Sequence, residues 1–261
     1  MKIGCCAGIE KAPVLYQAGY DFIECTVVSL LPEASEEEFT PILRKYQESP
    51  IPVQSFNILL PGDLKIVGEQ VDKERIKRYL STALKRVKQI GADTIVFGSG
   101  GARTLPNGFS RKKGEEQIVE FLHMTADIAD PLGLTIVIEP LNKKESNIIN
   151  SVPEAVAFAK LVNRKSIKTL ADFYHMDEEK EPLTHIYENK DFVKHIHVAD
   201  TGRISPGMGS YPYPEFLNQI RRSQYNGRMA IECNWNDFET EAKQALIFLK
   251  KQLNFHSSPL L

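Results

Sequence analysis

The stretch of sequence that decides the fold is Thr135-Ile136-Val137-Ile138-Glu139-Pro140-Leu141-Asn142. Its four apolar or β-branched residues run without alternation, which is typical of a strand buried on both faces in a parallel sheet. The run stops at Glu139, and Pro140 cannot continue the ladder because it has no backbone N–H. Glu139 is therefore predicted to lie at the carboxyl end of a buried strand, where parallel α/β folds bind their ligands.

The same pattern recurs three more times along the chain. Short apolar runs end at Asp172, in His197 and at Glu232. They follow one another at intervals of about 25 to 35 residues, the length of one βα unit. In a closed barrel the carboxyl ends of successive strands meet at one mouth, so we expect these four side chains to converge.

The rest of the chain alternates between short apolar runs and amphipathic segments. Segment 72–90 shows this best, because its apolar residues recur at three-and-four spacing before Gly91 ends it. The predicted strands are 2–6, 22–25, 53–56, 94–97, 135–138, 168–172, 193–197 and 229–232. The predicted helices are 11–18, 36–47, 72–90, 115–130, 153–162, 183–188, 214–222 and 238–253.

Eight strands that alternate with eight helices indicate a single (β/α)8 TIM barrel over residues 1–255. An open doubly wound sheet is the rival, but it would not bring four successive strand ends to one mouth. Residues 256–261 are expected to form a disordered tail.

Length and composition agree with one barrel. The chain has 261 residues, and an eight-unit barrel needs about 250. Its net charge of −2 and the lack of a basic tract exclude nucleic acid as the expected partner. The apolar runs are far shorter than the ~18 residues that span a membrane. No signal-peptide pattern follows Met1, and the four cysteines suit reduced thiols, so we predict a cytoplasmic protein without a membrane partner.

The four residues at the strand ends suit a metal ion. Two glutamates, an aspartate and a histidine offer three oxygen ligands and one nitrogen, a set typical of Mn²⁺, Mg²⁺ or Co²⁺. Of these, Mn²⁺ fits the ligand types best. A single carboxylate at a strand end is more often a loop hydrogen-bonding group, but three carboxylates and a histidine at regular spacing favour a metal site. His195, one layer deeper than His197 on the same side of its strand, is interpreted as a hydrogen-bonded residue behind the site.

Such an ion keeps coordination positions open for two adjacent substrate oxygens. Polarising a carbonyl and its neighbouring hydroxyl acidifies the C–H bond between them and stabilises an enediolate. A carboxylate that shares its metal contact can serve as the general base. The strand-end residues therefore predict isomerisation or epimerisation of a sugar.

With these residues laid out, the chain resembles the sugar isomerase/epimerase superfamily of xylose-isomerase-like barrels. Within it, the chain looks most similar to the D-tagatose 3-epimerase and D-psicose (D-allulose) 3-epimerase family. Residues 139–145 resemble its E-P-L-N-x-x-E segment, residues 172–176 its D-x-x-H-M segment, and residues 195–203 its H-x-H…R segment. Glu232 matches its last-strand glutamate.

The resemblance implies roles for seven residues. The implied metal ligands are Glu139, Asp172, His197 and Glu232. The implied catalytic pair is Glu139 and Glu232, and the implied substrate contacts are Glu145, His175 and Arg203. The activity it implies is C3 epimerisation of a free ketose or keto-sugar through a cis-enediolate, in a homodimer or homotetramer that takes a small sugar.

Other functions stay open on the same scaffold. An aldose–ketose isomerase of the hydroxypyruvate or rhamnose type, or a keto-sugar lyase, would use the same metal site. An abasic-site endonuclease needs a histidine-rich site and a basic surface, which six histidines and a slight negative charge do not favour. A non-catalytic binding protein would predict no metal.

The first half of the chain departs from the family pattern. Residues 98–103 stand where the epimerases place aromatic residues that grip the far end of the sugar, and Asn57 stands where they often have a small or sulfur-bearing residue. Glu24 and Arg103 are expected to add polar groups to the cleft. A larger sugar, a keto-sugar glycoside and a modified ketose are all compatible with these differences.

Overall fold

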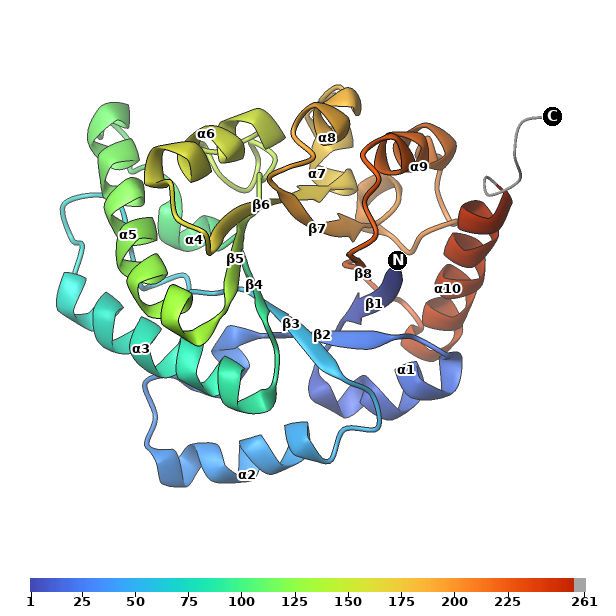
Figure 1. Cartoon of the computed structure of the whole chain (residues 1–261), viewed down its shortest axis with the longest axis horizontal. Helices are drawn as coiled ribbons and strands as arrows, with labels where there is room; N and C mark the ends of the chain where they lie inside the picture. The colour runs from blue at the N-terminus through green and yellow to red at the C-terminus, as the bar shows by residue number, and fades with distance from the viewer. Residues whose placement is uncertain (256–261) are drawn as a thin grey trace.

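The computed structural model describes residues 1–255, and the predicted tail at 256–261 lies outside the described residues. Eight parallel strands follow one another in chain order and close into a barrel when β1 pairs with β8 (Figure 1). The (β/α)8 prediction is confirmed. The strands are β1 (Lys2–Cys6), β2 (Phe22–Thr26), β3 (Val53–Asn57), β4 (Thr94–Phe97), β5 (Thr135–Ile138), β6 (Ile167–Asp172), β7 (Val193–Val198) and β8 (Arg228–Ile231).

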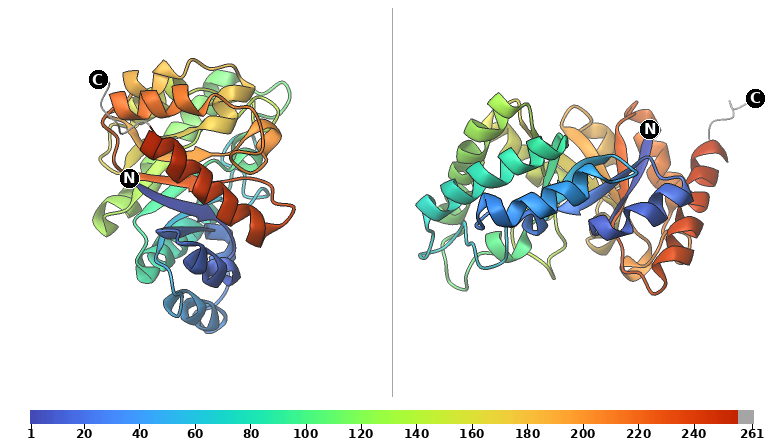
Figure 2. Two further views of the ribbon diagram at one scale, coloured as in Figure 1. Left: turned by 90° about the vertical axis from the view of Figure 1, so that its right-hand side faces the viewer. Right: turned by 90° about the horizontal axis from the view of Figure 1, so that it is seen from below.

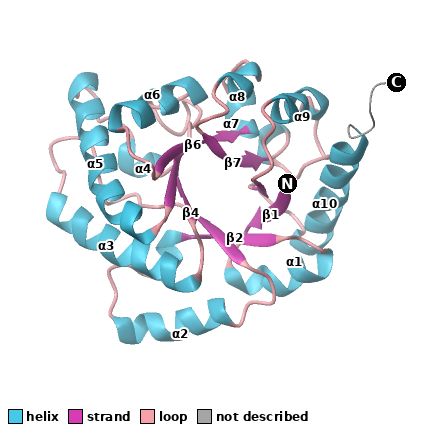
Figure 3. Cartoon of the chain, in the orientation of Figure 1, coloured by secondary structure: helices cyan, strands magenta, loops and turns pink. Residues whose placement is uncertain are grey.

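The main helices surround this barrel on the outside (Figure 3). They are α1 (Ala12–Ala18), α2 (Glu36–Gln47), α3 (Lys73–Ile90), α5 (Arg111–Leu132), α6 (Val152–Val162), α8 (Thr184–Glu188), α9 (Tyr213–Arg222) and α10 (Phe238–Phe255). The last helix packs beside the first and closes the ring, as the side views show (Figure 2). No helix within residues 1–255 is long and apolar enough to cross a membrane.

The predicted helix boundaries differ from the structure where capping residues decide them. α5 begins at Arg111, earlier than predicted, because the Ser110 hydroxyl accepts a hydrogen bond from the backbone N–H of Lys113. α2 begins where predicted, because Ser35 and Glu38 form a reciprocal capping box.

The prediction of eight helices was too low, because short helices follow several strands. These are α4 (Gly100–Arg103), α7 (Phe173–Glu178) and the 3₁₀ turns η1 (Ile9–Lys11), η2 (Val27–Leu30) and η3 (Thr201–Arg203). These elements are too short to show the three-and-four spacing of apolar residues by which a helix is recognised in a sequence.

The barrel interior carries a small apolar layer under the mouth. Val96, Val137 and Leu170 are fully buried and form a cluster separate from the larger core between strands and helices. Val137 and Leu170 precede Glu139 and Asp172 by two residues, so the pleat turns each pair toward the same side. The apolar layer therefore lies directly beneath the strand-end carboxylates.

Candidate active site and metal centre

The four strand-end residues converge at the mouth of the barrel, as predicted. Glu139, Asp172, His197 and Glu232 each offer one ligand atom, and these atoms all lie within 4.8 Å of one another. Parallel register contributes directly, because β6 and β7 pair Asp172 with His197. Ligand atoms of an octahedral ion at about 2.1 Å stand about 3 to 4.2 Å apart, so this set can close around one cation with small adjustments.

The two nitrogens of the His197 ring have separate roles. Nε2 lies 2.8 Å from Oε1 of Glu24, behind the mouth. Nδ1 points to the other side, 3.1 Å from Oε1 of Glu139 and 3.6 Å from Oε2 of Glu232. A carboxylate on one ring nitrogen fixes the orientation and tautomer of a metal-binding histidine. Nδ1 is thus the nitrogen that would face an ion.

Glu24 lies beneath the site and not in the cleft, so the expectation for this residue was wrong. Its carboxylate is fully buried and lies 2.7 Å from Nε2 of His195 in addition to His197. The Ser55 hydroxyl and the Cys6 thiol also donate to it. Burial would raise the pKa of Glu24, but the two imidazoles outweigh it and hold this pKa well below the ordinary value. Glu24 is therefore an anionic anchor for His197, and His195 is the hydrogen-bonded residue that was predicted.

The two carboxylate oxygens of Asp172 have different contacts, one with a helix N-terminus and one with the residue cluster at the mouth. Oδ1 caps α7 by accepting hydrogen bonds from the backbone N–H groups of Tyr174 (2.7 Å) and His175 (3.3 Å). Oδ2 faces the cluster, 3.9 Å from Nδ1 of His197. Burial is the main cause that raises the pKa of Asp172 to about 6. The cap explains why α7 starts immediately after β6 and keeps one oxygen free for an ion.

The carboxylate of Glu139 fits at the mouth because Gly98, at the end of the neighbouring strand β4, has no side chain. A Cβ atom at Gly98 would stand 2.1 Å from Oε2 of Glu139, so only glycine leaves room for the carboxylate. Burial, and next the charge of Glu232, raise the pKa of Glu139 above its ordinary value. Sequence reasoning missed this role of Gly98, because the contact joins two different strands.

Arg103 is also outside the cleft, which corrects the second expectation about polar groups. Its guanidinium is fully buried and donates to the backbone carbonyls of Phe97 (3.0 Å) and Glu139 (2.7 Å). Burial lowers the pKa of Arg103 to about 10. The residue ties the ends of β4 and β5 together from behind.

Glu232 is held by two donors. Asn57 Nδ2 donates to Oε1 at 2.8 Å, and Arg203 Nη2 donates to Oε2 at 2.6 Å. Burial would raise the pKa of Glu232, but His197 and Arg203 lower it to about 2. Sequence analysis noted Asn57 only as a departure from the family pattern, and the structure places its amide directly on a predicted catalytic carboxylate.

His175 presents an unused donor to the mouth. Its Nδ1 accepts a hydrogen bond from the backbone N–H of Asn142 at 3.1 Å, so the proton of the neutral ring lies on Nε2. Nε2 is buried and has no hydrogen-bond partner within the described residues, and Oδ2 of Asp172 lies 3.9 Å from it. Burial lowers the pKa of His175 and keeps the ring neutral. A buried N–H without a partner at a predicted substrate contact is a natural donor to a ligand oxygen.

Arg203 and Glu145 form the rim above Glu232. Arg203 Nη1 donates to Oε1 of Glu145 at 3.0 Å, and its guanidinium lies over the ring of Tyr174 with 5.1 Å to the centroid. The three residues predicted as substrate contacts thus lie at the same mouth as the predicted metal ligands. Glu145, Arg203 and the ends of β3 and β4 border a cavity of about 280 Å³, called here the catalytic cavity, whereas His175 lies behind its lining.

The donor set fits a divalent cation. Glu24, Glu139, Asp172 and Glu232 surround His197, while Arg203 is the cation that pairs directly with this group among the described residues. An excess of carboxylates around one imidazole is costly unless a cation compensates it. A second possible group, Cys6 with Glu24 and His197, uses the far nitrogen of His197 and is already joined by hydrogen bonds.

Comparison with known proteins agrees with this geometry. Residues 14–252 match the family described as xylose isomerase-like TIM barrel. The D-psicose 3-epimerase of Agrobacterium fabrum (strain C58 / ATCC 33970) is 31% identical over 233 residues, 86% of this chain and 77% of that protein. The 3-dehydro-D-guloside 4-epimerase of Escherichia coli (strain K12) is 26% identical over 175 residues, 64% of this chain and 67% of that protein.

Among solved structures, the D-psicose 3-epimerase with D-tagatose from Clostridium cellulolyticum H10 superposes with a TM-score of 0.84. It is 21% identical and the match covers 97% of this chain and 99% of that one, which shows a shared fold. The relatives are sugar epimerases, and the resemblance recognised from the sequence motifs is confirmed. The chain therefore belongs to the xylose isomerase-like TIM-barrel family.

Proposed function

We propose that this protein is a divalent-metal-dependent epimerase that inverts C3 of a free ketose or a related keto-sugar. The observation that carries the proposal is the convergence of four ligand atoms within 4.8 Å, beside the unpartnered Nε2–H of His175. The names of the relatives support the sugar, and the ligand types support Mn²⁺, with Mg²⁺ or Co²⁺ as substitutes. Cytoplasmic location and homo-oligomeric assembly stay predictions.

The chain supplies each remaining part of the reaction. Glu139, Asp172, His197 and Glu232 would hold the ion, which when bound acidifies the C–H bond beside the substrate carbonyl. One of the carboxylates of Glu139 and Glu232 removes the C3 proton, and the other returns a proton to the opposite face of the cis-enediolate. Because the pair exchanges roles in the reverse direction, both must reach C3.

Other residues hold the substrate and the developing charge. His175 Nε2–H donates to a substrate oxygen that becomes negative as the proton leaves, and burial keeps this donor neutral. Arg203 keeps Glu232 in position and reaches the same end of the sugar, while Glu145 fixes the guanidinium from the other side.

Proton NMR in D₂O tests this proposal. The Mg²⁺-loaded protein is incubated with fructose, psicose, tagatose and sorbose, and deuterium is located on each product. We expect deuterium at C3 together with the C3 epimer, and no epimer with Glu232→Gln at matched concentration. An aldose that carries deuterium at C2, or recovered ketose that carries it at C1, would instead identify the isomerase alternative. Cleavage products would identify a lyase, and undiminished formation of the C3 epimer by Glu232→Gln would remove this carboxylate from the mechanism.

A further inference from the structure

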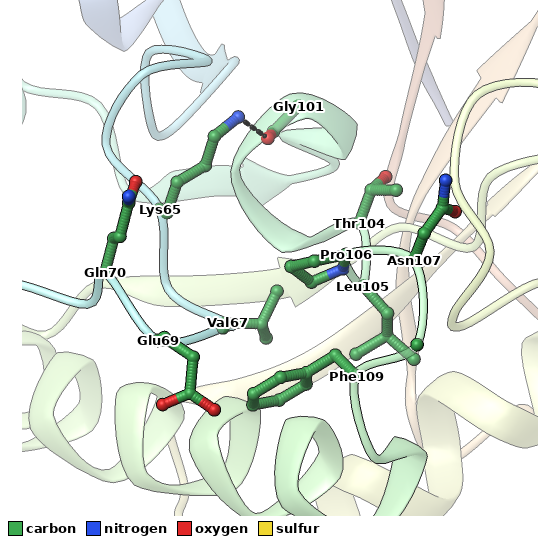
Figure 4. Close-up of a pocket in the computed structure, with 12 residues that line it drawn as sticks. Lys65, Val67, Glu69, Gln70, Gly101, Thr104, Leu105, Pro106, Asn107 and Phe109 are labelled. Carbon is green, nitrogen blue, oxygen red and sulfur yellow. Dashed lines mark hydrogen bonds between the residues drawn. The ribbon is translucent and has the colours of Figure 1, made fainter.

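A second and larger cavity lies next to the catalytic cavity. It has a volume of about 930 Å³ and lies between residues 65–70, which follow β3, and residues 104–109, which follow β4 (Figure 4). We call it the outer cavity. The catalytic cavity, at about 280 Å³, has room for little more than one small sugar, whereas cavities for larger organic ligands span about 300 to 1,000 Å³.

The two cavities meet at a border made of backbone. Gly101 lines both of them, and Gly62 lines the catalytic cavity on the opposite side of the border. The two backbones lie in contact, since a Cβ atom at Gly101 would stand 3.2 Å from the Cα atom of Gly62, whereas a Cβ atom at Gly62 would point away from Gly101. Lys65 Nζ donates to the carbonyls of both residues at 2.6 Å and keeps the two loops in register (Figure 4 shows its bond to Gly101).

The glycine at position 62 has no structural explanation. Its φ lies outside the left-handed region that favours glycine, and a Cβ atom there would have no heavy atom within 4 Å. Neither the backbone conformation nor packing therefore excludes a side chain. Because Gly62 lines the catalytic cavity, the missing side chain leaves open space on that side of the border, where a ligand can approach the backbone closely.

The lining of the outer cavity suits a neutral ring with one apolar face. The ring of Phe109 lies near the side chains of Val67 and Leu105, and the amides of Gln70 and Asn107 lie toward opposite sides of the opening (Figure 4). A pyranose or an aryl ring presents an apolar face to such a surface, and the amides can bond to hydroxyls at its edge.

Charge argues against an anionic ligand in the outer cavity. Lys65 is the one cationic side chain in its lining, and its ammonium group is already bound to two carbonyls. Glu69 adds a negative charge to the same lining. A phosphate would meet this carboxylate without a free cation to compensate, so the favoured occupant is uncharged.

We propose that the outer cavity is a subsite for a sugar or aryl group that the substrate carries, so that the substrate is a substituted keto-sugar and not a free ketose. This inference rests on the proposed function of the catalytic cavity. The reacting carbonyl must stay free, so the substituent is attached through an oxygen remote from it. Two sources have this chemistry: a reducing ketose disaccharide linked through O6, and a glycoside whose keto group lies away from its anomeric carbon.

Exchange measurements with paired substrates test the subsite. The rate of solvent deuterium incorporation beside the carbonyl is compared for fructose and isomaltulose, which is fructose carrying glucose on O6. A second pair, methyl and phenyl 4-keto-β-glucoside, in which C3 lies beside the keto group, tests the other source. We expect kcat/KM to be at least tenfold higher for the larger member of one pair. Equal values within both pairs would overturn the inference while leaving the proposed epimerisation intact.

Two variants connect this preference with the border and the outer cavity. Gly62→Phe should lower the ratio of the two kcat/KM values at least fivefold, because its side chain would fill the open space on the catalytic-cavity side of the border, and Gly62→Ala should lower it less. Phe109→Ala should lower the ratio by removing the apolar surface. An unchanged ratio in both Gly62→Phe and Phe109→Ala would contradict the assignment.

A binding measurement separates failure of the subsite from failure of the reaction. Phenyl β-glucoside, which has no keto group, should give a saturation-transfer NMR signal with the metal-loaded protein that Phe109→Ala abolishes. If no keto-sugar exchanges but this signal is present, the proposed reaction is wrong and the subsite stands. If the signal is absent or survives in Phe109→Ala, the subsite assignment is wrong.

Discussion

Replacing Gly98 by alanine should disable the site while leaving the barrel folded. A Cβ atom at this position would lie 2.1 Å from Oε2 of Glu139, and real Cβ atoms essentially never come closer than 3.0 Å to another heavy atom. The carboxylate must therefore retreat by about 1 Å, and displacements of this size can cost about 100-fold in rate. Overpacking at a buried position also costs about 1 to 3 kcal/mol of folding free energy.

The assay measures three properties of Gly98→Ala: kcat/KM for the most reactive sugar, the affinity for Mn²⁺ by calorimetry, and the urea midpoint. We expect about 100-fold lower kcat/KM and weaker Mn²⁺ binding with a cooperative unfolding transition. Gly8→Ala is the matched control, because its Cβ would also meet a carboxylate, at 2.4 Å, but Glu10 is exposed and can swing into solvent. A Gly98→Ala protein within threefold of wild type in both kcat/KM and Mn²⁺ affinity would refute the reasoning.

Three further predictions follow from the same structure. His175→Ala should remove turnover. It should also lower the free energy of unfolding in urea by about 1 to 3 kcal/mol, because the buried N–H of Asn142 loses its acceptor. The control His123→Ala, at an exposed position, should lower it by less than about 0.5 kcal/mol. Arg86→Met should lower the free energy of unfolding by about 3 kcal/mol with little effect on kcat, because Arg86 is buried and donates to four backbone carbonyls. Arg78→Met, at an exposed position, is the control, and equal urea midpoints for the two variants would contradict the role of Arg86. Removing the metal ion with a chelator should lower the thermal unfolding midpoint, since an ion at 100 times its Kd adds about 2.7 kcal/mol to the free energy of unfolding. An unchanged midpoint on adding Mn²⁺ would contradict binding to the folded state.

Glu139, Asp172 and Glu232 could be predicted from sequence because each follows a short apolar run, and His197 because it ends a predicted strand at the same spacing. In a parallel barrel such a run forms a strand that is buried on both faces, and the polar residue that follows it lies at the mouth of the barrel. A similar signal was present at Glu24, which lies near the end of the predicted strand 22–25, but in the structure it is the middle residue of β2. It was misplaced because depth in the barrel depends on strand stagger, which apolar periodicity does not report.

The contacts that position the site could not be predicted, because they join residues from different strands. The contact between Gly98 and Glu139 depends on the pairing of β4 with β5, and the contact between Asn57 and Glu232 crosses the mouth from β3 to β8. Arg103 was misplaced for a related reason. A charged residue after a strand is usually exposed, and only the structure shows the carbonyls that compensate its burial.

The most direct test of the account is a metal titration of the exchange reaction. The protein is stripped with EDTA, dialysed and given increasing Mn²⁺, and the samples are quenched and freed of metal before NMR. Deuterium at the carbon beside the carbonyl is then measured for each ketose and substituted keto-sugar named above. The account predicts no exchange in the stripped protein and a rise that saturates at one equivalent of Mn²⁺. Exchange that persists without metal, or no exchange with any sugar at any Mn²⁺ ratio, would contradict it.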